Sequence, residues 1–212
     1  TLEQQLGTGF QDAQWIMNAY TLACTSVLMA AGTLADRFGR RRMLVLCLWL
    51  FGLASLACGL AENASLLIGA RFVQGVGAGA MMICQFAILS HQFREPAARA
   101  RAFAVWGVIA GLGLGFGPMV GALILAVADW RWVFLVHVPL TLLTLVLLHV
   151  SVQESRDPAG NRLDIAGMVT LTLSVFALVY FITQGTENGF GAPAMLGWAR
   201  SEERRVGKEC PR

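Results

Sequence analysis

Asp36 is the first residue whose type and position could do chemistry. It stands where a long apolar run ends, and Arg37, Arg40 and Arg41 follow it within five residues. A carboxylate at the C-terminal end of a helix faces the negative pole of the helix dipole, which costs about 0.3–1 kcal/mol. We therefore expect the adjacent arginines, or the N-terminus of another helix, to offset this charge. From the residues alone, a positively charged loop with one stray acid remains an equal interpretation.

Arg71 is the second candidate, because it lies within a long apolar run. An arginine at the centre of a membrane helix costs at least about 2.5–3.5 kcal/mol, so a buried one is a functional hypothesis by default. Arg71 is six residues beyond Ser65, where a helix could begin. Its side chain could therefore also extend to the membrane surface, and both interpretations are open at this point.

Two other patterns could suggest an enzyme, and neither has the necessary spacing. Gly75, Gly77 and Gly79 alternate as in a nucleotide loop, but no strand precedes them and Ala80 occupies the place of the third fingerprint glycine. The three histidines lie near the ends of different apolar runs, without metal-ligand spacing or a nucleophile. They are His91, His137 and His149. We predict no enzyme, no metal site and no cofactor.

Glycines also repeat every four residues between positions 107 and 121, in two overlapping series. The first series is Gly107, Gly111 and Gly115, and the second is Gly113, Gly117 and Gly121. Small residues at this spacing let helix backbones approach closely. We expect this helix to pack tightly against its neighbours, with a kink invited by Pro118, which cannot donate a backbone hydrogen bond.

The elements that must position these residues are membrane-spanning helices. The 212 residues are 56% hydrophobic and 14% charged, with a mean hydropathy of +0.61, whereas soluble domains are about 25% charged. Six apolar runs approach the roughly 20 residues that cross a bilayer as helix. They cover residues 13–35, 43–61, 72–93, 102–128, 132–152 and 165–186. The sequence predicts an all-α polytopic membrane protein.

The short connections between these runs differ sharply in charge. Every second connection is rich in arginine, and the others contain only Arg131. The arginines of the rich connections are Arg37, Arg40, Arg41, Arg42, Arg94, Arg99, Arg101, Arg156 and Arg162. Because cytoplasmic loops collect positive residues, we expect residue 1 to lie outside the cytoplasm and one earlier helix to be missing.

The segment around Asp36 resembles the signature G-x-L-a-D-r-x-G-r-k-x-x-l of the major facilitator superfamily, found between its second and third helices. The resemblance implies that this segment is a gate, whose charges stabilise one conformation of alternating access, and that it does not bind substrate. The implied gating residues are Gly32, Leu34, Asp36, Arg37, Gly39, Arg40 and Arg41.

Further segments resemble motifs of the same superfamily, in the same order. Residues 71–80 are similar to its fourth-helix motif, which implies a role in proton coupling for Arg71, Gln74 and Gly75. Residues 113–122 are similar to its antiporter motif, carried by Gly113, Gly117, Pro118 and Gly121, with Ala122 in place of a usual glycine. Residues 130–139 resemble the start of its sixth helix, with interfacial tryptophans and with His137 in place of asparagine. The start of the first apolar run also resembles this superfamily, and the resemblance implies that Trp15, Asn18 and Tyr20 face the substrate.

The resemblance also organises the chain as a partial transporter covering about helices two to seven of the superfamily fold. We expect residues 1–152 to be an N-terminal repeat without its first helix, 153–164 a cytoplasmic loop, 165–186 an extra linking helix and 187–199 a periplasmic loop. This short cytoplasmic loop favours the fourteen-span drug:proton antiporter branch. Residues 200–210 resemble a translated sequencing adaptor, so we expect residues 200–212 to be non-native.

The implied function is proton-coupled export of hydrophobic or cationic drugs across a bacterial cytoplasmic (inner) membrane. The implied partners are small-molecule drugs or toxic compounds, protons, the lipid bilayer and, as a candidate, a periplasmic adaptor protein, with no nucleic acid. A nutrient or metabolite symporter of the same superfamily is the alternative function, and a non-transporting membrane sensor also stays open.

Overall fold

Long helices make up the fold in the computed structural model, which describes residues 9–152, 154 and 165–188. The helices are α2 (Phe10–Phe38), α3 (Arg40–Gly59), α4 (Ala64–Gln92), α5 (Pro96–Val127), α6 (Arg131–Leu135), α7 (His137–Ser151) and α8 (Ile165–Asn188). Among the described residues, six helical segments are long and apolar enough to cross a membrane. Helices α6 and α7 together form one of these segments, and each of the other five helices forms one. The prediction of six apolar spans in an all-α fold is thereby confirmed. The expected tail, and most of the two loops around α8, lie outside the described residues.

Local residue types explain three of the helix boundaries. The side chain of Asn63 accepts a hydrogen bond from the backbone N–H of Leu66 over 2.8 Å, which caps α4. Gly39 joins α2 to α3 with a φ of 105°, a conformation that side chains disfavour. Within the span predicted as 132–152, the helix is interrupted at Val136, because Pro139 has no N–H to donate to the carbonyl of Leu135.

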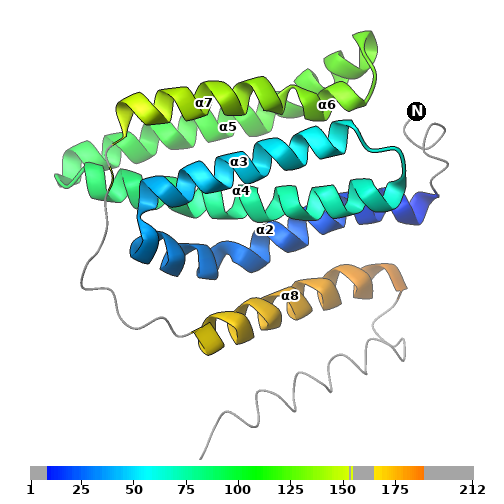
Figure 1. Cartoon of the computed structure of the whole chain (residues 1–212), viewed down its shortest axis with the longest axis horizontal. Coiled ribbons are helices and arrows are strands. Elements are labelled where there is room, and N and C mark those ends of the chain that lie inside the picture. Colours follow the sequence, from blue (N-terminus) through cyan, green and yellow to red (C-terminus); the bar gives the residue numbers. More distant parts are fainter. Residues whose placement is uncertain (1–8, 153, 155–164, 189–212) are drawn as a thin grey trace, which may run out of the picture.

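Helix α4 holds the described bundle together, with α2 on one side and α3 on another. In Figure 1, α8 lies beside α2 at the lower edge, and α7 lies beyond α3. Helix α5 contacts α4 and α6, near its two ends. Asp36 lies near the end of α2 and Arg71 lies on α4, so both belong to the part of the bundle where α2, α3 and α4 pack together.

Three glycines bring the backbones of these helices together. A Cβ atom at Gly75 or Gly79 would collide with the carbonyl oxygens of Tyr20 and Cys24 on α2. A Cβ atom at Gly77 would lie 3.1 Å from the backbone nitrogen of Phe51 on α3. The alternating glycines that mimic a nucleotide loop in the sequence are therefore helix contacts on two faces of α4.

The prediction that the glycines of α5 pack tightly is wrong for the described residues. No atom of the described chain outside α5's own backbone lies within 4 Å of a Cβ built at any of the six predicted positions, and no residue of α5 is buried. The physical reason is that α5 contacts its neighbours near its ends, so its middle faces away from them. The helix continues through Pro118 without interruption.

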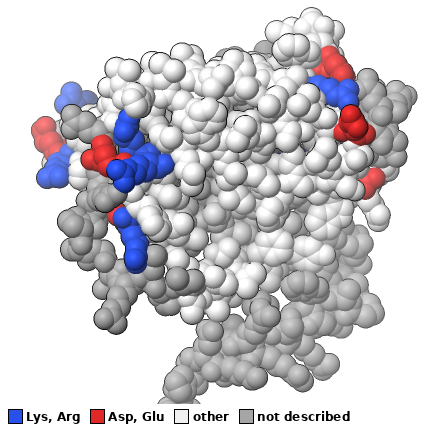
Figure 2. Space-filling view, viewed as in Figure 1, with Lys and Arg blue, Asp and Glu red and all other residues white. Residues whose placement is uncertain are grey.

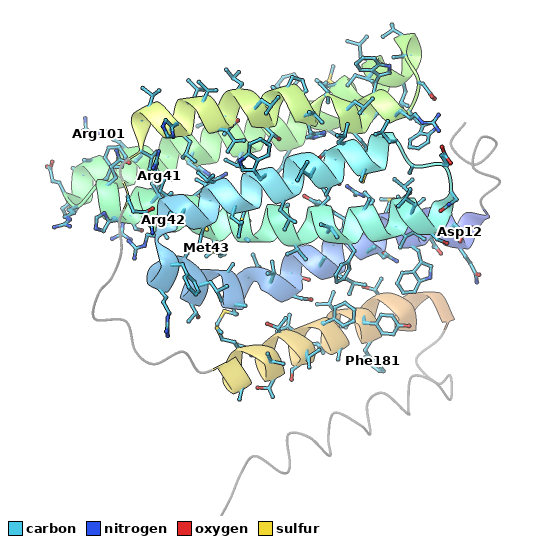
Figure 3. All side chains as sticks on the ribbon, in the orientation of Figure 1. Asp12, Arg41, Arg42, Met43, Arg101 and Phe181 are labelled. Carbon is cyan, nitrogen blue, oxygen red and sulfur yellow. The ribbon has the colours of Figure 1, made fainter. Side chains whose placement is uncertain are left out.

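On the face shown in Figure 2, charged residues gather at the two ends, with an uncharged band between them. One end, here called the arginine-rich end, carries Arg37, Arg40, Arg41, Arg42, Arg94, Arg99 and Arg101, and labels in Figure 3 place Arg41, Arg42 and Arg101 there, opposite Asp12. The predicted clustering of loop arginines is confirmed for the described ones. Trp130, one of the aromatics expected at the interface, lies beside Asp129 and Arg131 and is 6% exposed because it packs into the core on Phe134.

The α2–α4 contact predicts that Gly79→Ala in the full-length protein lowers the free energy of unfolding by about 1–3 kcal/mol, because the added methyl group meets backbone that must move. Gly69→Ala is the matched control, since it lies on the same helix with nothing within 4 Å of its Cβ position. Unfolding in detergent micelles, followed by circular dichroism, measures the difference. Equal stability of the two variants would contradict the close contact.

Candidate functional site

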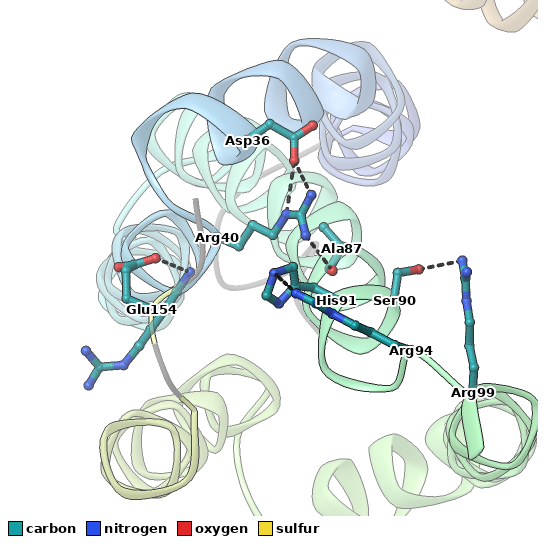
Figure 4. Close-up of polar contacts among 9 residues, drawn as sticks. Asp36, Arg40, Ala87, Ser90, His91, Arg94, Arg99 and Glu154 are labelled. Atoms are coloured by element: carbon teal, nitrogen blue, oxygen red, sulfur yellow. Dashed lines mark hydrogen bonds and ion pairs between the residues drawn. The ribbon is translucent and has the colours of Figure 1, made fainter. Parts of the chain in front are cut away.

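Asp36 forms an ion pair with Arg40 across the turn between α2 and α3 (Figure 4). Arg40 donates to Asp36 Oδ1 from Nε over 3.0 Å and from Nη2 over 2.7 Å. Its Nη1 also donates to the carbonyl oxygen of Ala87 on α4, over 3.4 Å. The expectation that an arginine offsets the Asp36 charge is confirmed. Exposed pairs contribute only about 0–1 kcal/mol, so the main effect of this one is to join three helices at one point.

Glu154, which is not among the predicted site residues, makes a second contact at this turn. Its carboxylate accepts from the backbone N–H groups of Arg41 and Arg42, each over 3.2 Å, and lies 3.4 Å from Nε of Arg42. The first N–H groups of a helix have no partner within the helix, and the positive pole of its dipole favours an anion there. Glu154 therefore caps α3 from the segment that follows α7.

The other predicted gating residues have different surroundings. Gly39 leaves room for Glu154, which a Cβ atom would meet at 2.5 Å. Arg41 reaches α7, where its Nη2 donates to the carbonyl oxygen of His149 over 3.3 Å. Gly32 faces Ile83 of α4, and Leu34 is half-buried. Arg37 is exposed in the last turn of α2, directly after Asp36.

Arg71 is held between α2, α4 and α6, near the opposite end of the bundle. Its Nε donates to the carbonyl oxygen of Ile16 over 3.2 Å, and its Nη1 donates to Gln74 Oε1 over 2.8 Å. The guanidinium lies 4.3 Å from the centre of the Tyr20 ring and 5.7 Å from that of Phe134. Such cation–π contacts contribute about 0.5–2 kcal/mol. The side chain turns toward its neighbouring helices, which favours the buried interpretation over extension to the membrane surface.

No carboxylate of the described residues forms an ion pair with Arg71. Its described partners are neutral, namely a carbonyl, an amide and two rings. The site therefore presents a positive charge stabilised by oriented dipoles and aromatic faces, in the low dielectric of a membrane protein.

The remaining predicted residues are dispersed. Tyr20 contacts Arg71. The ring centres of Trp15 and of Tyr180 on α8 lie 6.0 Å apart, and Asn18 is half-buried. Of the antiporter-motif residues, Gly113, Gly117 and Pro118 are exposed and Gly121 is half-buried on α5. The structure thus brings Arg71, Gln74, Gly75 and Tyr20 together, and Asp36 with Arg40. Glu154 is the residue that the sequence reasoning missed, because it lies 113 residues from Arg41 and no local pattern connects the two.

In the described part of the chain, six apolar helical segments pack with the Arg71 guanidinium held among them and a charged turn at one end, and these features define a polytopic helical membrane protein. The sequence profile of the Major Facilitator Superfamily matches residues 1–199. The chain belongs to this superfamily.

Curated relatives carry names from drug resistance. The chain is 36% identical over 189 residues to Multidrug resistance protein Stp of Mycobacterium tuberculosis, and 37% identical over 184 residues to Drug efflux pump JefA of the same organism. It is 35% identical over 196 residues to Puromycin resistance protein pur8 of Streptomyces alboniger. These matches cover 89%, 87% and 92% of this chain, and 35%, 36% and 39% of the relatives. The chain therefore spans little more than a third of the length of these relatives.

The Glu154 cap predicts that Glu154→Ala in the full-length protein lowers the free energy of unfolding by about 0.5–2 kcal/mol, as loss of a helix N-cap does. Glu95→Ala is the matched control, because Glu95 precedes α5 without a side-chain capping bond. Detergent-micelle unfolding of both variants measures the effect. A Glu95→Ala loss as large as that of Glu154→Ala would contradict the cap.

Proposed function

We propose that the full-length protein is a proton-coupled drug exporter of the bacterial cytoplasmic membrane. In this proposal a hydrophobic or cationic drug leaves through a central cavity while protons enter, as two halves rock about a site near the bilayer midplane. The relatives Stp, JefA and pur8 are named for multidrug resistance, drug efflux and puromycin resistance, which supports export of drugs. The driving force would be the proton gradient, with no cofactor.

The observation that carries this proposal is the environment of Arg71. A cation fixed among neutral groups disfavours proton binding by any acid that approaches it, and favours the ionised form of that acid. A conformational change that brings such an acid nearer, or takes it away, therefore releases or binds a proton. Arg71 with Gln74 and Gly75 would couple this proton step to movement of α4 against α2.

The cluster of Asp36, Arg40 and Glu154 would be the gate. It joins α2, α3, α4 and the segment after α7 at the arginine-rich end, which we propose to be the cytoplasmic end. These contacts would form in one conformation of the transport cycle and separate in the other. Trp15, Asn18 and Tyr20 would face the substrate path, and the motif on α5 would face the second half of the transporter.

The short connection before α8 supports one branch of the superfamily. We propose the fourteen-span antiporter branch, with α8 as the linking helix, a drug or toxic compound as substrate, and a periplasmic adaptor as candidate partner. Lipid surrounds the uncharged band, and no nucleic acid is involved.

Proton flux in inverted membrane vesicles that contain the full-length protein tests this function. Added drug should dissipate an imposed proton gradient, because drug and proton exchange in opposite directions. Movement of drug and proton in the same direction would indicate a symporter instead. Drug binding without any flux would indicate a sensor.

Two single substitutions should abolish export while membrane insertion stays intact. We expect Asp36→Asn and Arg71→Ala to lower drug-driven proton flux at least about tenfold, since hydrogen bonds to charged groups contribute about 1.5–3 kcal/mol. Asp12→Asn and Arg101→Ala are the matched controls, because both lie outside the two clusters. Fluorescent-drug efflux and immunoblots of the membrane fraction provide the measurements. Unimpaired efflux by either test variant would refute the role of that residue.

A further inference from the structure

A row of buried polar groups leads from Arg71 into α3. Gln74 is 2% exposed and Ser55 is 0% exposed. Arg71 Nη1 donates to Gln74 Oε1 over 2.8 Å, and Gln74 Nε2 donates to Ser55 Oγ over 2.8 Å. The Ser55 hydroxyl in turn donates to the carbonyl oxygen of Phe51 over 2.7 Å. Four groups on two helices therefore form one continuous chain of hydrogen bonds.

The groups at the two ends of this row of hydrogen bonds determine the direction in which each bond is donated. A guanidinium can only donate hydrogen bonds, and a backbone carbonyl can only accept them. The amide and the hydroxyl between them must each accept from the Arg71 side and donate toward α3. A reversed Gln74 amide would point its NH₂ group at the guanidinium, and its oxygen at a hydroxyl whose hydrogen is already bonded to Phe51.

Ser55 is the group that makes one orientation of Gln74 favourable. Without its hydroxyl, the buried Nε2 of Gln74 loses its acceptor, and a buried unsatisfied donor is costly. Gly77 keeps the α3 backbone at Phe51 close to α4, and Ser55 is one helical turn further along. The position of the Ser55 hydroxyl is therefore fixed by the same packing that fixes Gln74.

We propose that Ser55 is a positioning residue for transport, which orients the Gln74 amide so that its oxygen holds the Arg71 guanidinium. The effect of Ser55 on transport rests on the coupling role proposed for Arg71. Ser55 acts through Gln74 and needs no contact with Arg71, with drug or with protons.

Full-length variants in proteoliposomes test this role. The test variants are Ser55→Ala, Ser55→Thr, Gln74→Met and the double variant Ser55→Ala with Gln74→Met. The matched control is Ser26→Ala, because Ser26 is a 7% exposed helix serine whose hydroxyl donates to Leu22 of its own helix. One readout is drug-driven proton flux across a range of pH. The other is the rate at which phenylglyoxal modifies Arg71, measured by peptide mass spectrometry.

We expect Ser55→Ala to lower the flux about fivefold, the change in an equilibrium that one hydrogen bond makes, and to alter its pH profile. It should also make Arg71 react faster, whereas Ser26→Ala should change neither readout. Ser55→Thr keeps the hydroxyl and should restore both. The double variant should match Gln74→Met alone, because Ser55 acts only through that residue.

Three results would overturn the inference: Arg71 reactivity unchanged in Ser55→Ala, the same flux in Ser55→Ala and Ser26→Ala, or multiplied losses in the double variant. A wild-type protein without drug:proton exchange is a different result. It would refute the proposed function, and faster modification of Arg71 in Ser55→Ala would still establish the positioning role.

Discussion

The described bundle depends on close backbone contact between helices that lipid surrounds. Apolar side chains gain little by leaving lipid for a protein interior, so membrane helices associate through tight packing and polar bonds. Gly75 and Gly79 admit the backbone of α2, and Gly77 admits that of α3. This contact brings the carbonyl oxygen of Ile16 within hydrogen-bonding distance of Arg71 on α4.

The same helices carry both charged clusters, at opposite ends. Helix α4 bears Arg71 near its start and Ala87 near its end, and α2 bears Tyr20 and Asp36 in the same order. Arg40 joins the far ends of α2 and α4, whereas Arg71 joins their near ends. A movement of α4 along α2 would therefore alter both sets of contacts together, which is a physical route for coupling a gate to a proton site.

The sequence predicted what depends on local pattern and missed what depends on contact between distant segments. Hydropathy was sufficient for six spans, and the dipole argument was sufficient for the pairing of Asp36 with a nearby arginine. Glu154 lies 113 residues from Arg41, so nothing local connects the two. The burial of Trp130 and the exposed middle of α5 depend likewise on which helices become neighbours. At Arg71 the residue type left two orientations open, and only the position of α2 distinguishes them.

The position of the Arg71 guanidinium in lipid tests the central claim most directly. A cryo-EM map of the full-length transporter in nanodiscs would show this side chain. We predict a guanidinium stacked on the Tyr20 ring and within hydrogen-bonding distance of Gln74 and of the Ile16 carbonyl. An Arg71 side chain extended toward the lipid headgroups, away from α2, would contradict the proposed coupling site.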